Sequence, residues 1–576
     1  MTTRTGRLNE LAENGSTQVL IIGGGINGIA TFRELALQGV SAVIVDRGDF
    51  VSGASAASSH MVHGGIRYLE NGEFALVKES VQERNRLVKN APHLVKPLPT
   101  TIPLNHVFAG ILAAPLRFVT HKQRTPKARG AILVKIGLVM YDAFAGGGTV
   151  VPKHRFRGKK ATRELLPDLN PDLSYTATYY DAAMASPERL ALDVLHDGLD
   201  HNENAHAFNY LEAVGTEGTA VRLRDRLTGR EFTVQADVVV NASGPWSDLT
   251  NDSFGLSTRF MGGTKGSHIV LDNDELYNAC NGREIFFENS DGRIVLVYPL
   301  AGKVLVGTTD LRVDIANDDI TCTEEEIDYF FHLTKHVFPN IHVDRSQIVF
   351  SFSGVRPLPR TEDEAPGFIS RDYRIEEATL GTGTNTSTLL TLVGGKWTTF
   401  RALGEQLSDA VLAILGEQRS LSTRDLAIGG GRNYPATDAG QTRWKATHLA
   451  AFSAERADVL FERYGTRAAD VAEFISATGP ERDDLGAGAD LTSAEVRYMV
   501  EKEHVVKVSD VLYRRTDLAF RGAVTVRLVK ALASCVGDVL GWSEDERDAA
   551  EVETLADLRR ARARMTQSES VTAAQL

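Results

Sequence analysis

The sequence has few cysteines and no long hydrophobic run, and both absences narrow what the protein can be. Its 576 residues include only Cys280, Cys322 and Cys535, whose separations fit neither a zinc motif nor a disulfide framework. No run of about 18 consecutive apolar residues occurs, so we expect no membrane-spanning helix. Residues 1–17 are polar and lack the apolar centre of a signal peptide. These absences predict an enzyme of a reducing compartment without a metal site, and they leave association with a membrane surface open.

Basic charge is also in short supply. The chain has 63 Lys and Arg against 75 Asp and Glu, a net charge of −12, which argues against nucleic acid as the main partner. A hydrophobic content of 43% and a charged content of 24% are ordinary for a soluble globular protein. The length exceeds what one compact core accommodates, so we expect two or three domains.

Residues 18–46 have the pattern of a strand, a glycine turn, a helix and a second strand. Gly23, Gly25 and Gly28 follow the first apolar run with dinucleotide-binding spacing, and Asp46 ends the second run. In such a turn the first glycine permits the bend, the second lets a pyrophosphate approach the backbone and the third lets helix and strand pack. The amino end of the helix then faces the phosphates, and the acid accepts the ribose hydroxyls. The pattern predicts a bound adenine dinucleotide.

A second glycine turn, far along the chain, indicates which dinucleotide it is. An apolar run stops at Gly394-Gly395, and Lys396, Trp397 and Thr398 follow before a helical pattern begins. A helix amino end there would point its dipole and N–H groups at a flavin and stabilise the reduced, anionic ring. A plain glycine turn with a solvated lysine is the alternative. No further G-x-G-x-x-G motif exists for a nicotinamide cofactor, so FAD is favoured over NAD.

Other segments indicate the remaining organisation, and no internal repeat is seen. Residues 73–90 alternate charged and apolar positions, as an exposed helix does. Residues 295–297 and 304–306 predict neighbouring strands about a turn. A glycine-rich loop at 428–432 marks a boundary, beyond which the sequence becomes helical and charged.

Short motifs recur in a fixed order between residues 17 and 405, and one more follows near the C-terminus. They are Gly23-Gly24-Gly25-Ile26-Asn27-Gly28, Ser58-Ser59, His63-Gly64-Gly65-Ile66-Arg67-Tyr68-Leu69-Glu70, Ala91-Pro92-His93-Leu94, Asn241-Ala242-Ser243-Gly244-Pro245-Trp246, Lys265-Gly266-Ser267-His268, Gly307-Thr308-Thr309-Asp310, Gly354-Val355-Arg356-Pro357-Leu358, Arg371-Asp372-Tyr373, Gly394-Gly395-Lys396 and Asp510-Val511-Leu512-Tyr513-Arg514-Arg515-Thr516. With these motifs the chain resembles the aerobic FAD-dependent glycerol-3-phosphate dehydrogenases, which are amino-acid-oxidase-like flavoproteins. The resemblance covers nearly the whole chain.

The resemblance implies an α/β fold, α+β overall, in three parts. These are a Rossmann-like FAD-binding domain, an interleaved substrate domain with an antiparallel sheet and a C-terminal helical cap domain. The expected bounds are 1–96, 236–268 and 350–430 for the FAD-binding domain, 97–235 and 269–349 for the substrate domain, 433–560 for the helical domain and 561–576 for a disordered tail.

The activity implied by the resemblance is oxidation of sn-glycerol 3-phosphate to dihydroxyacetone phosphate, with hydride transfer to FAD and electrons passing to a membrane quinone. No metal is implied. The cofactor-binding residues carried over from the motifs are Gly23, Gly24, Gly25, Asn27, Gly28, Asp46, Arg47, Ser58, Ser59, Gly64, Gly65, Ala242, Gly244, Trp246, Gly395, Lys396, Trp397 and Thr398.

The substrate is a phosphate dianion with a C2 hydroxyl that must lose a proton. Arginine suits the dianion because its fork binds phosphate bidentately, and Arg67, Arg356 and Arg371 match substrate-contacting arginines of the family. Tyr68 is a further phosphate or hydroxyl contact, and Lys396 binds a substrate oxygen while its charge stabilises reduced flavin. His63 and His268 are the candidate bases, each with a structural role as the alternative. The catalytic residues expected are Lys396, Arg67, His63 and His268.

Two regions depart from the family pattern. His60 stands where relatives often carry lysine, either as a tolerated change or with altered flavin contacts. Residues 107–144 look longer than in shorter relatives and combine apolar runs with basic residues in an otherwise acidic chain. This stretch suits docking on an anionic membrane, but an internal helix pair with a solvated basic loop is equally compatible. The C-terminal helices are a second candidate for the membrane face, or for a homodimer contact.

The expected protein is therefore cytoplasmic and peripherally associated with the inner face of the membrane. Three rival functions remain. An oxygen-using glycerophosphate oxidase on the same fold would release peroxide. A flavin-dependent amine or amino-acid oxidase would bind a carboxylate with fewer cations, and a non-catalytic flavin-binding sensor would not need three arginines and a lysine.

Overall fold

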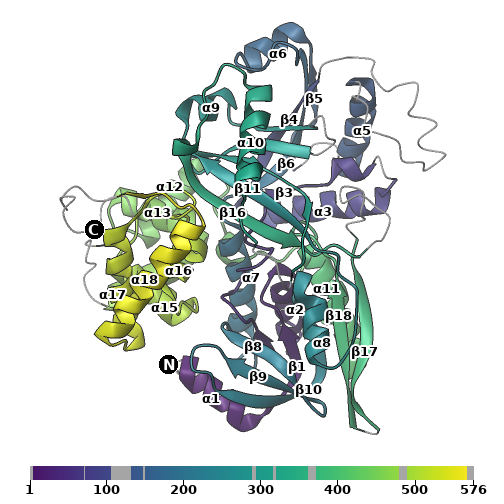
Figure 1. Cartoon of the computed structure of the whole chain (residues 1–576), viewed down its shortest axis with the longest axis vertical. Coiled ribbons are helices and arrows are strands. Elements are labelled where there is room, and N and C mark those ends of the chain that lie inside the picture. Colours follow the sequence, from purple (N-terminus) through teal and green to yellow (C-terminus); the bar gives the residue numbers. More distant parts are fainter. Residues whose placement is uncertain are drawn as a thin grey trace.

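The computed structural model describes residues 4–566 except for short internal segments. The segments outside the description are 70–71, 105–130, 147–149, 289–293, 316–319, 361–371, 384, 479–484 and 486–489. Two sheets and a set of C-terminal helices make up the described chain, and Figure 1 shows one sheet below the other with the C-terminal helices beside them.

The central strands of the first sheet are apolar and buried on both faces, as parallel strands between covering layers usually are. Its order is β17-β18-β10-β1-β2-β7, parallel except for the β17–β18 hairpin, and β8 and β9 extend the free part of β10 as an antiparallel ribbon. The strands are β1 (Ser16–Ile22), β2 (Ala42–Val45), β7 (His206–Phe208), β8 (Leu211–Glu217), β9 (Ala220–Asp225), β10 (Glu231–Asn241), β17 (Arg374–Thr382) and β18 (Asn385–Val393).

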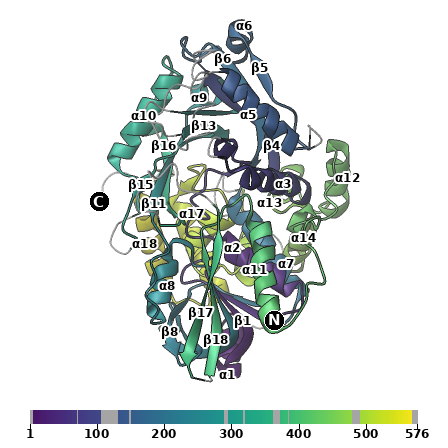
Figure 2. The same cartoon turned by 90° about the vertical axis from the view of Figure 1, so that its right-hand side faces the viewer.

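Three helices from distant parts of the sequence cover one face of this sheet. They share a hydrophobic core with β1, β2 and β18 and lie together in both views (Figures 1 and 2). A second core on the other side joins the sheet to the β8–β9 ribbon and to the N-terminal helix. The helices concerned are α1 (Arg4–Asn14), α2 (Ile26–Ala36), α7 (Pro187–His201), α8 (Ser247–Ser253) and α11 (Phe400–Leu415), with the short η2 (Gly244–Trp246).

The second sheet is almost wholly antiparallel. Its order is β15-β11-β14-β13-β12-β4-β6-β3, with β16 beside β11 and β5 beside β6, and only β12 and β4 are parallel. The strands are β3 (Met61–Val62), β4 (Val95–Leu104), β5 (Arg155–Arg157), β6 (Tyr175–Met184), β11 (Thr264–Leu271), β12 (Glu284–Glu288), β13 (Ile294–Leu300), β14 (Lys303–Gly307), β15 (Leu311–Arg312) and β16 (Ile348–Arg356). The expected neighbouring strands at 295–297 and 304–306 are the antiparallel pair β13–β14.

Two groups of helices pack against this sheet: α9 and α10 share a hydrophobic core with β11 to β14, and α3 and α5 share one with β4 and β6. One of them, α10, begins in a capping box in which Thr323 and Glu326 each accept a backbone N–H of the other, and three acidic residues occupy its first turn. The helices are η1 (Ile66–Leu69), α3 (Phe74–Asn90), α5 (Ala131–Phe144), α6 (Lys159–Leu165), α9 (Asp274–Ala279), α10 (Glu324–Val337) and η3 (Arg345–Gln347).

The C-terminal part is helical with its own hydrophobic core. Buried ion pairs fasten it to the loop after β2 and to α7. The Asp49 carboxylate pairs with the guanidinium groups of Arg514 and Arg515, and that of Glu503 pairs with Arg189 at 2.7 Å. Its elements are η5 (Gly429–Gly431), α12 (Asp438–His448), α13 (Ala454–Tyr464), η6 (Gly465–Arg467), α14 (Ala468–Thr478), α15 (Ser493–Lys502), α16 (Val508–Asp510), the π-helical η7 (Val511–Arg515), β19 (Val524–Thr525), α17 (Val526–Leu540), α18 (Glu544–Arg560) and β20 (Met565–Thr566). The expected fold class is confirmed.

The expected domain bounds need three corrections. Residues 206–235, assigned to the substrate domain, lie in the first sheet because β7 pairs with β2 and β9 with β10. Residues 264–268 and 350–356, assigned to the FAD-binding domain, lie in the second sheet, where β11 pairs with β16. The expected disordered tail begins too early, because residues 565–566 form β20, which pairs with β19, and Arg564 forms an ion pair with Asp272 at 2.7 Å. The residues from 567 onward lie outside the description.

Two expectations about helices are also revised. The helix over 73–90 is present as α3, but it is not simply exposed, because Ser80, Glu83 and Arg84 are each at most 1% exposed. Of the stretch 107–144, residues 107–130 lie outside the description, and α5 buries Leu138 and Tyr141 against α3 and β6. Within the described residues, no helix is both long and apolar enough to cross a membrane.

Candidate active site

The first glycine turn joins the end of β1 to α2, as expected from its spacing. Gly23 has φ +111°, and a Cβ there would lie 2.5 Å from the carbonyl oxygen of Ala242, while a Cβ on Gly28 would lie 2.0 Å from the oxygen of Gly23. Gly25 differs: it caps α2 with φ −77°, and the nearest atom to an added Cβ is Ser55 Oγ at 3.2 Å. The fold itself therefore requires Gly23 and Gly28, whereas the space beside Gly25 serves something other than packing.

The acid after the second strand is held by the same turn. Asp46 Oδ2 accepts the N–H of Gly24 at 2.7 Å, and Oδ1 accepts that of Gly48 at 2.8 Å. Burial raises the pKa of Asp46 to about 6, and the two backbone hydrogen bonds oppose the rise. Next to it the guanidinium of Arg47 lies 4.7 Å from the ring of Trp246, close to Ala242 and Gly244. These groups meet at the carboxyl ends of β1, β2 and β10, where open α/β sheets bind ligands.

The second glycine turn rests directly on the first. Gly394 and Gly395 have φ of +93° and +110°, and a Cβ on Gly395 would lie 2.4 Å from Asn27 Nδ2 on α2. Trp397 Nε1 donates to the carbonyl of Ser55 at 2.9 Å, and Thr398 Oγ1 donates to that of His63 at 3.0 Å. Two segments near the N-terminus and a third more than 330 residues further along the chain thus form one site.

These residues fit a dinucleotide with a flavin. The amino ends of α2 and α11 both open at this site and leave backbone N–H groups for anionic oxygens. Asn27 Oδ1 and Thr399 Oγ1 are buried there without a hydrogen-bond partner among the described residues. Buried polar atoms of this kind normally have partners, so their position indicates a ligand.

Lys396 lies at the boundary between this site and α3. Its side chain is buried, its Nζ donates to Ser80 Oγ at 3.0 Å, and the same nitrogen lies 4.9 Å from the centre of the Tyr68 ring. Glu79 is close enough for the ammonium to lower its pKa, although burial gives a net rise. The His63 ring is also close to Tyr68, with ring centres 6.3 Å apart. The structure brings these expected residues together.

A second group of expected residues lies on β11 and β16. The His268 ring stacks on Phe352 at 4.8 Å and 15°, and its Nε2 is 2.8 Å from Ser59 Oγ. Burial, with Arg356 and His60 nearby, lowers the pKa of His268 to about 3, so the ring is neutral at neutral pH.

Arg356 is held in one orientation by neighbouring acceptors. Its Nη1 donates to Asp310 Oδ1 at 3.0 Å, and its Nη2 donates to Thr308 Oγ1 at 3.0 Å and to the carbonyl of Thr309 at 2.9 Å. The guanidinium lies against Gly266, where an added Cβ would be 2.2 Å away. A fixed planar fork is the geometry that recognises phosphate.

The remaining expected residues fall into two sets. Ser58 Oγ accepts a hydrogen bond from the N–H of His60. The N–H of Gly64 donates to the Tyr141 hydroxyl and to Asp181 Oδ1 at 3.0 Å each, and Gly65 has φ +72°. The Arg67 side chain and the whole of Arg371 lie outside the described residues.

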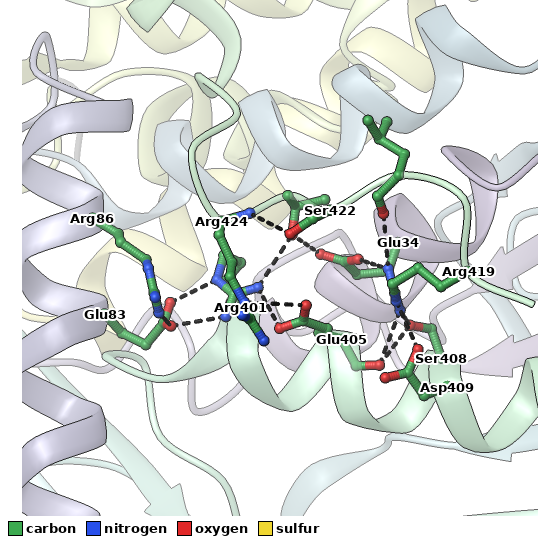
Figure 3. Close-up of polar contacts among 12 residues, drawn as sticks. Glu34, Glu83, Arg86, Arg401, Glu405, Ser408, Asp409, Arg419, Ser422 and Arg424 are labelled. Carbon is green, nitrogen blue, oxygen red and sulfur yellow. Dashed lines mark hydrogen bonds and ion pairs between the residues drawn. The ribbon is translucent and has the colours of Figure 1, made fainter.

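Sequence reasoning missed the support that α3 gives to the site. Glu83 on α3 accepts two hydrogen bonds from Arg401 of α11 at 2.8 Å each, and Arg401 also donates to Glu405 (Figure 3). Arg419 extends the network to Glu34 of α2 at 2.6 Å. Because the network joins α2, α3 and α11, it fixes Ser80 relative to the turn that carries Lys396. The signal in the sequence is the spacing of Ser80, Glu83 and Arg84, which places them on one face of the helix. The many charged residues of the segment obscured it, because they indicate an exposed helix.

Comparison with known proteins defines the class first. Residues 18–401 match the family described as FAD dependent oxidoreductase, and residues 421–547 match the C-terminal domain of alpha-glycerophosphate oxidase. The protein is an FAD-dependent oxidoreductase, and FAD is its cofactor.

Individual relatives then narrow the family. The chain is 31% identical over 559 residues to a glycerol-3-phosphate dehydrogenase of Synechocystis, covering 93% of this chain and 95% of the relative. It is 31% identical over 520 residues to D-erythritol 1-phosphate dehydrogenase of Brucella abortus, covering 88% and 95%. The structure of a Bacillus halodurans glycerol-3-phosphate dehydrogenase with FAD has the same fold, with a TM-score of 0.74 at 24% identity over 99% of this chain and 100% of that one. The chain belongs to the FAD-dependent glycerol-3-phosphate dehydrogenase family.

Proposed function

We propose that the protein oxidises sn-glycerol 3-phosphate at C2 to dihydroxyacetone phosphate. The observation that carries the proposal is the buried ammonium of Lys396 beside the two glycine turns, with the oriented guanidinium of Arg356 on the adjoining sheet. Bound FAD supplies the two-electron acceptor for this oxidation. The residues around it bind the phosphate, position the carbinol and accept its proton.

Each role follows from the chemistry of the side chain. Arg356, together with Arg67 and Arg371, binds the phosphate, and Tyr68 contacts the phosphate or the hydroxyl. Lys396 places positive charge where negative charge develops during the oxidation. A neutral imidazole accepts the C2 hydroxyl proton, and His63 and His268 are the candidates.

Arg356→Ala is expected to raise KM for glycerol 3-phosphate on the order of 10- to 100-fold, because a charge-assisted hydrogen bond to an anion contributes about 1.5–3 kcal/mol. FAD content should stay at the wild-type level, since Asp310, Thr308 and Thr309, which follow β14 in the second sheet, hold the Arg356 guanidinium. Steady-state kinetics and the flavin-to-protein ratio measure both quantities. Arg360→Ala, an exposed arginine four residues along, is the matched control and should leave KM unchanged. A wild-type KM for Arg356→Ala would remove the phosphate assignment.

D-erythritol 1-phosphate is the second candidate substrate, because a relative of equal identity is named for it. Both compounds carry a phosphate monoester next to secondary hydroxyls, so the arginines would bind either. The ratio of kcat/KM for the two substrates decides between them. We expect it to favour glycerol 3-phosphate, and a ratio in favour of the tetritol would reassign the substrate.

We further propose that electrons pass to a membrane quinone and that the reduced enzyme reacts slowly with oxygen. The enzyme would then work at the inner face of the cytoplasmic membrane without spanning it. The acidic chain concentrates basic residues and apolar runs in residues 107–144, which suits docking on anionic lipid. An oxygen-using oxidase would instead release stoichiometric peroxide at a rate that matches quinone turnover.

Replacing Lys122, Arg124, Lys127 and Arg129 with glutamine is expected to reduce binding to anionic vesicles by up to about 10³-fold, because each of the four basic residues contributes about 1 kcal/mol near such a surface. Binding of the wild-type protein should fall with salt, since the screening length shortens to about 3 Å at 1 M. Vesicle sedimentation measures both, and anaerobic reduction by substrate should be unchanged.

The matched control removes the same charge from the C-terminal helices. The four residues changed to glutamine in this control, all of them exposed, are Arg527, Lys530, Arg559 and Arg560. If this control releases the vesicles and the first variant does not, the docking surface belongs to the C-terminal helices.

A further inference from the structure

A second cavity, of about 200 Å³, lies where the two sheets meet the C-terminal helices. One wall is the loop of residues 52–60, which contributes Gly53, Ala56 and His60. Other residues of this loop have partners elsewhere: Ser55 Oγ accepts the first N–H of α2, and Ser59 Oγ contacts His268. The loop therefore separates the cavity from the cofactor site.

Four aromatic rings line part of the remaining walls. Phe350 and Phe352 come from β16, and Tyr513 and Phe520 come from the C-terminal part. The His60 ring joins them, 5.1 Å from Phe520 and 6.3 Å from Phe352 between ring centres. A cavity of about 150 Å³ is enough for benzene, so this one accepts a single substituted ring.

Two polar atoms on these walls lack partners. His60 Nδ1 and the Tyr513 hydroxyl are buried, and neither has a hydrogen-bond partner among the described residues. Burial lowers the pKa of His60 to about 4, so both groups are uncharged at neutral pH. Leaving a buried polar group unpaired costs about 1–3 kcal/mol, so two of them on one cavity indicate a ligand that bonds to both.

The charges at the cavity argue against an anionic ligand. Arg514 is already neutralised by Asp49 and Asp510, and Glu188 adds a buried carboxyl to the lining. Asp517 adds a further carboxylate, and no unpaired Lys or Arg side chain is among the described residues that line the cavity. The ligand that suits these walls is planar, uncharged and apolar, with oxygen acceptors for hydrogen bonds.

We propose that this cavity binds the ring of a para-quinone, whose carbonyl oxygens accept hydrogen bonds from the Tyr513 hydroxyl and from the tautomer of His60 that carries its proton on Nδ1. The proposal rests on the proposed function, because it gives the electron acceptor a site separated from the cofactor by one loop. It explains why both polar groups are unpaired in the free protein.

Ala56→Phe tests the proposal because the added ring fills the cavity. Titration calorimetry of the oxidised holoenzyme with duroquinone, without sugar phosphate present, is expected to show at least a 10-fold weaker Kd than for the wild type. Ala161→Phe, at an exposed position of α6 away from the cavity lining, is the matched control and should bind duroquinone normally.

Tyr513→Phe covers the case in which the larger substitution disturbs the fold. Loss of one neutral hydrogen bond should weaken duroquinone binding on the order of 3- to 10-fold. The Tm should stay the same or rise, because the hydroxyl has no partner in the free protein. A purely structural tyrosine would lose Tm and leave the Kd unchanged.

Anaerobic reduction of both variants by glycerol 3-phosphate separates this proposal from the proposed function. We expect wild-type reduction together with weakened quinone binding. Wild-type duroquinone affinity in both variants, or no binding by the wild-type holoenzyme, overturns the cavity assignment and leaves the substrate assignment standing. Failure of the wild-type enzyme to be reduced overturns the proposed function alone.

Discussion

Gly25→Val is expected to give a folded protein that no longer retains FAD. The backbone at Gly25 has an ordinary φ of −77°, and an added Cβ approaches only Ser55 Oγ, at 3.2 Å, so the fold tolerates a side chain. The valine would instead occupy the space in front of α2, where we expect the pyrophosphate to bind. Losing two charge-assisted hydrogen bonds costs about 3–6 kcal/mol, a loss of at least about 100-fold in FAD affinity. Flavin absorbance of the purified protein, circular dichroism and Tm are the measurements.

Two other glycines supply the controls. Gly158 caps α6 with φ −79° and has no atom within 4 Å of an added Cβ, so Gly158→Val should keep both fold and flavin. Gly28→Val should fail to fold, because its Cβ would lie 2.0 Å from the oxygen of Gly23. A full flavin complement in Gly25→Val would contradict the position of the nucleotide site.

Lys396→Met is expected to slow reduction of the flavin by saturating glycerol 3-phosphate by about 10²- to 10³-fold, the range found when one group that stabilises developing charge is removed. Methionine has nearly the length of lysine and takes no charge into a site where Lys396 is only 9% exposed, so folding and FAD content should be retained. Stopped-flow measurement of anaerobic flavin bleaching gives the rate directly.

Neighbouring residues sharpen this test. Lys78→Met, at an exposed position of α3, removes the same charge outside the site and should reduce at the wild-type rate. Ser80→Ala removes the acceptor of the Lys396 hydrogen bond and should give a smaller decrease, because the ammonium loses its position and keeps its charge. A wild-type rate for Lys396→Met would leave the lysine with a role in binding or structure only.

The nucleotide site could be predicted because its sequence signals are local. Gly23, Gly25, Gly28 and Asp46 lie within one strand-turn-helix-strand unit, and each glycine has a steric reason that spacing alone reveals. The second turn at Gly394-Gly395 was also recognisable from its strand and helix. That it rests on Asn27 could not be read from spacing, because the contact joins segments more than 360 residues apart.

What could not be predicted depends on long-range pairing. Residues 206–235 join the first sheet because β7 adds to the edge of β2, a pairing with no local signal. The segment 73–90 looked exposed because of its charges, yet Glu83 and Arg84 are buried in pairs with Arg401 and Asp181. Charged residues in a sequence indicate a solvent-exposed face only if the fold does not bring residues of opposite charge into contact with them.

The most direct test of the central claim is anaerobic titration of the yellow holoenzyme with glycerol 3-phosphate, with glycerol at the same concentration as the control. If the phosphate is bound by arginine and C2 is oxidised at the site beside Lys396, glycerol 3-phosphate should bleach the flavin stoichiometrically and release dihydroxyacetone phosphate. Glycerol should leave it oxidised. An unbleached flavin, or equal bleaching by glycerol, would contradict the assignment.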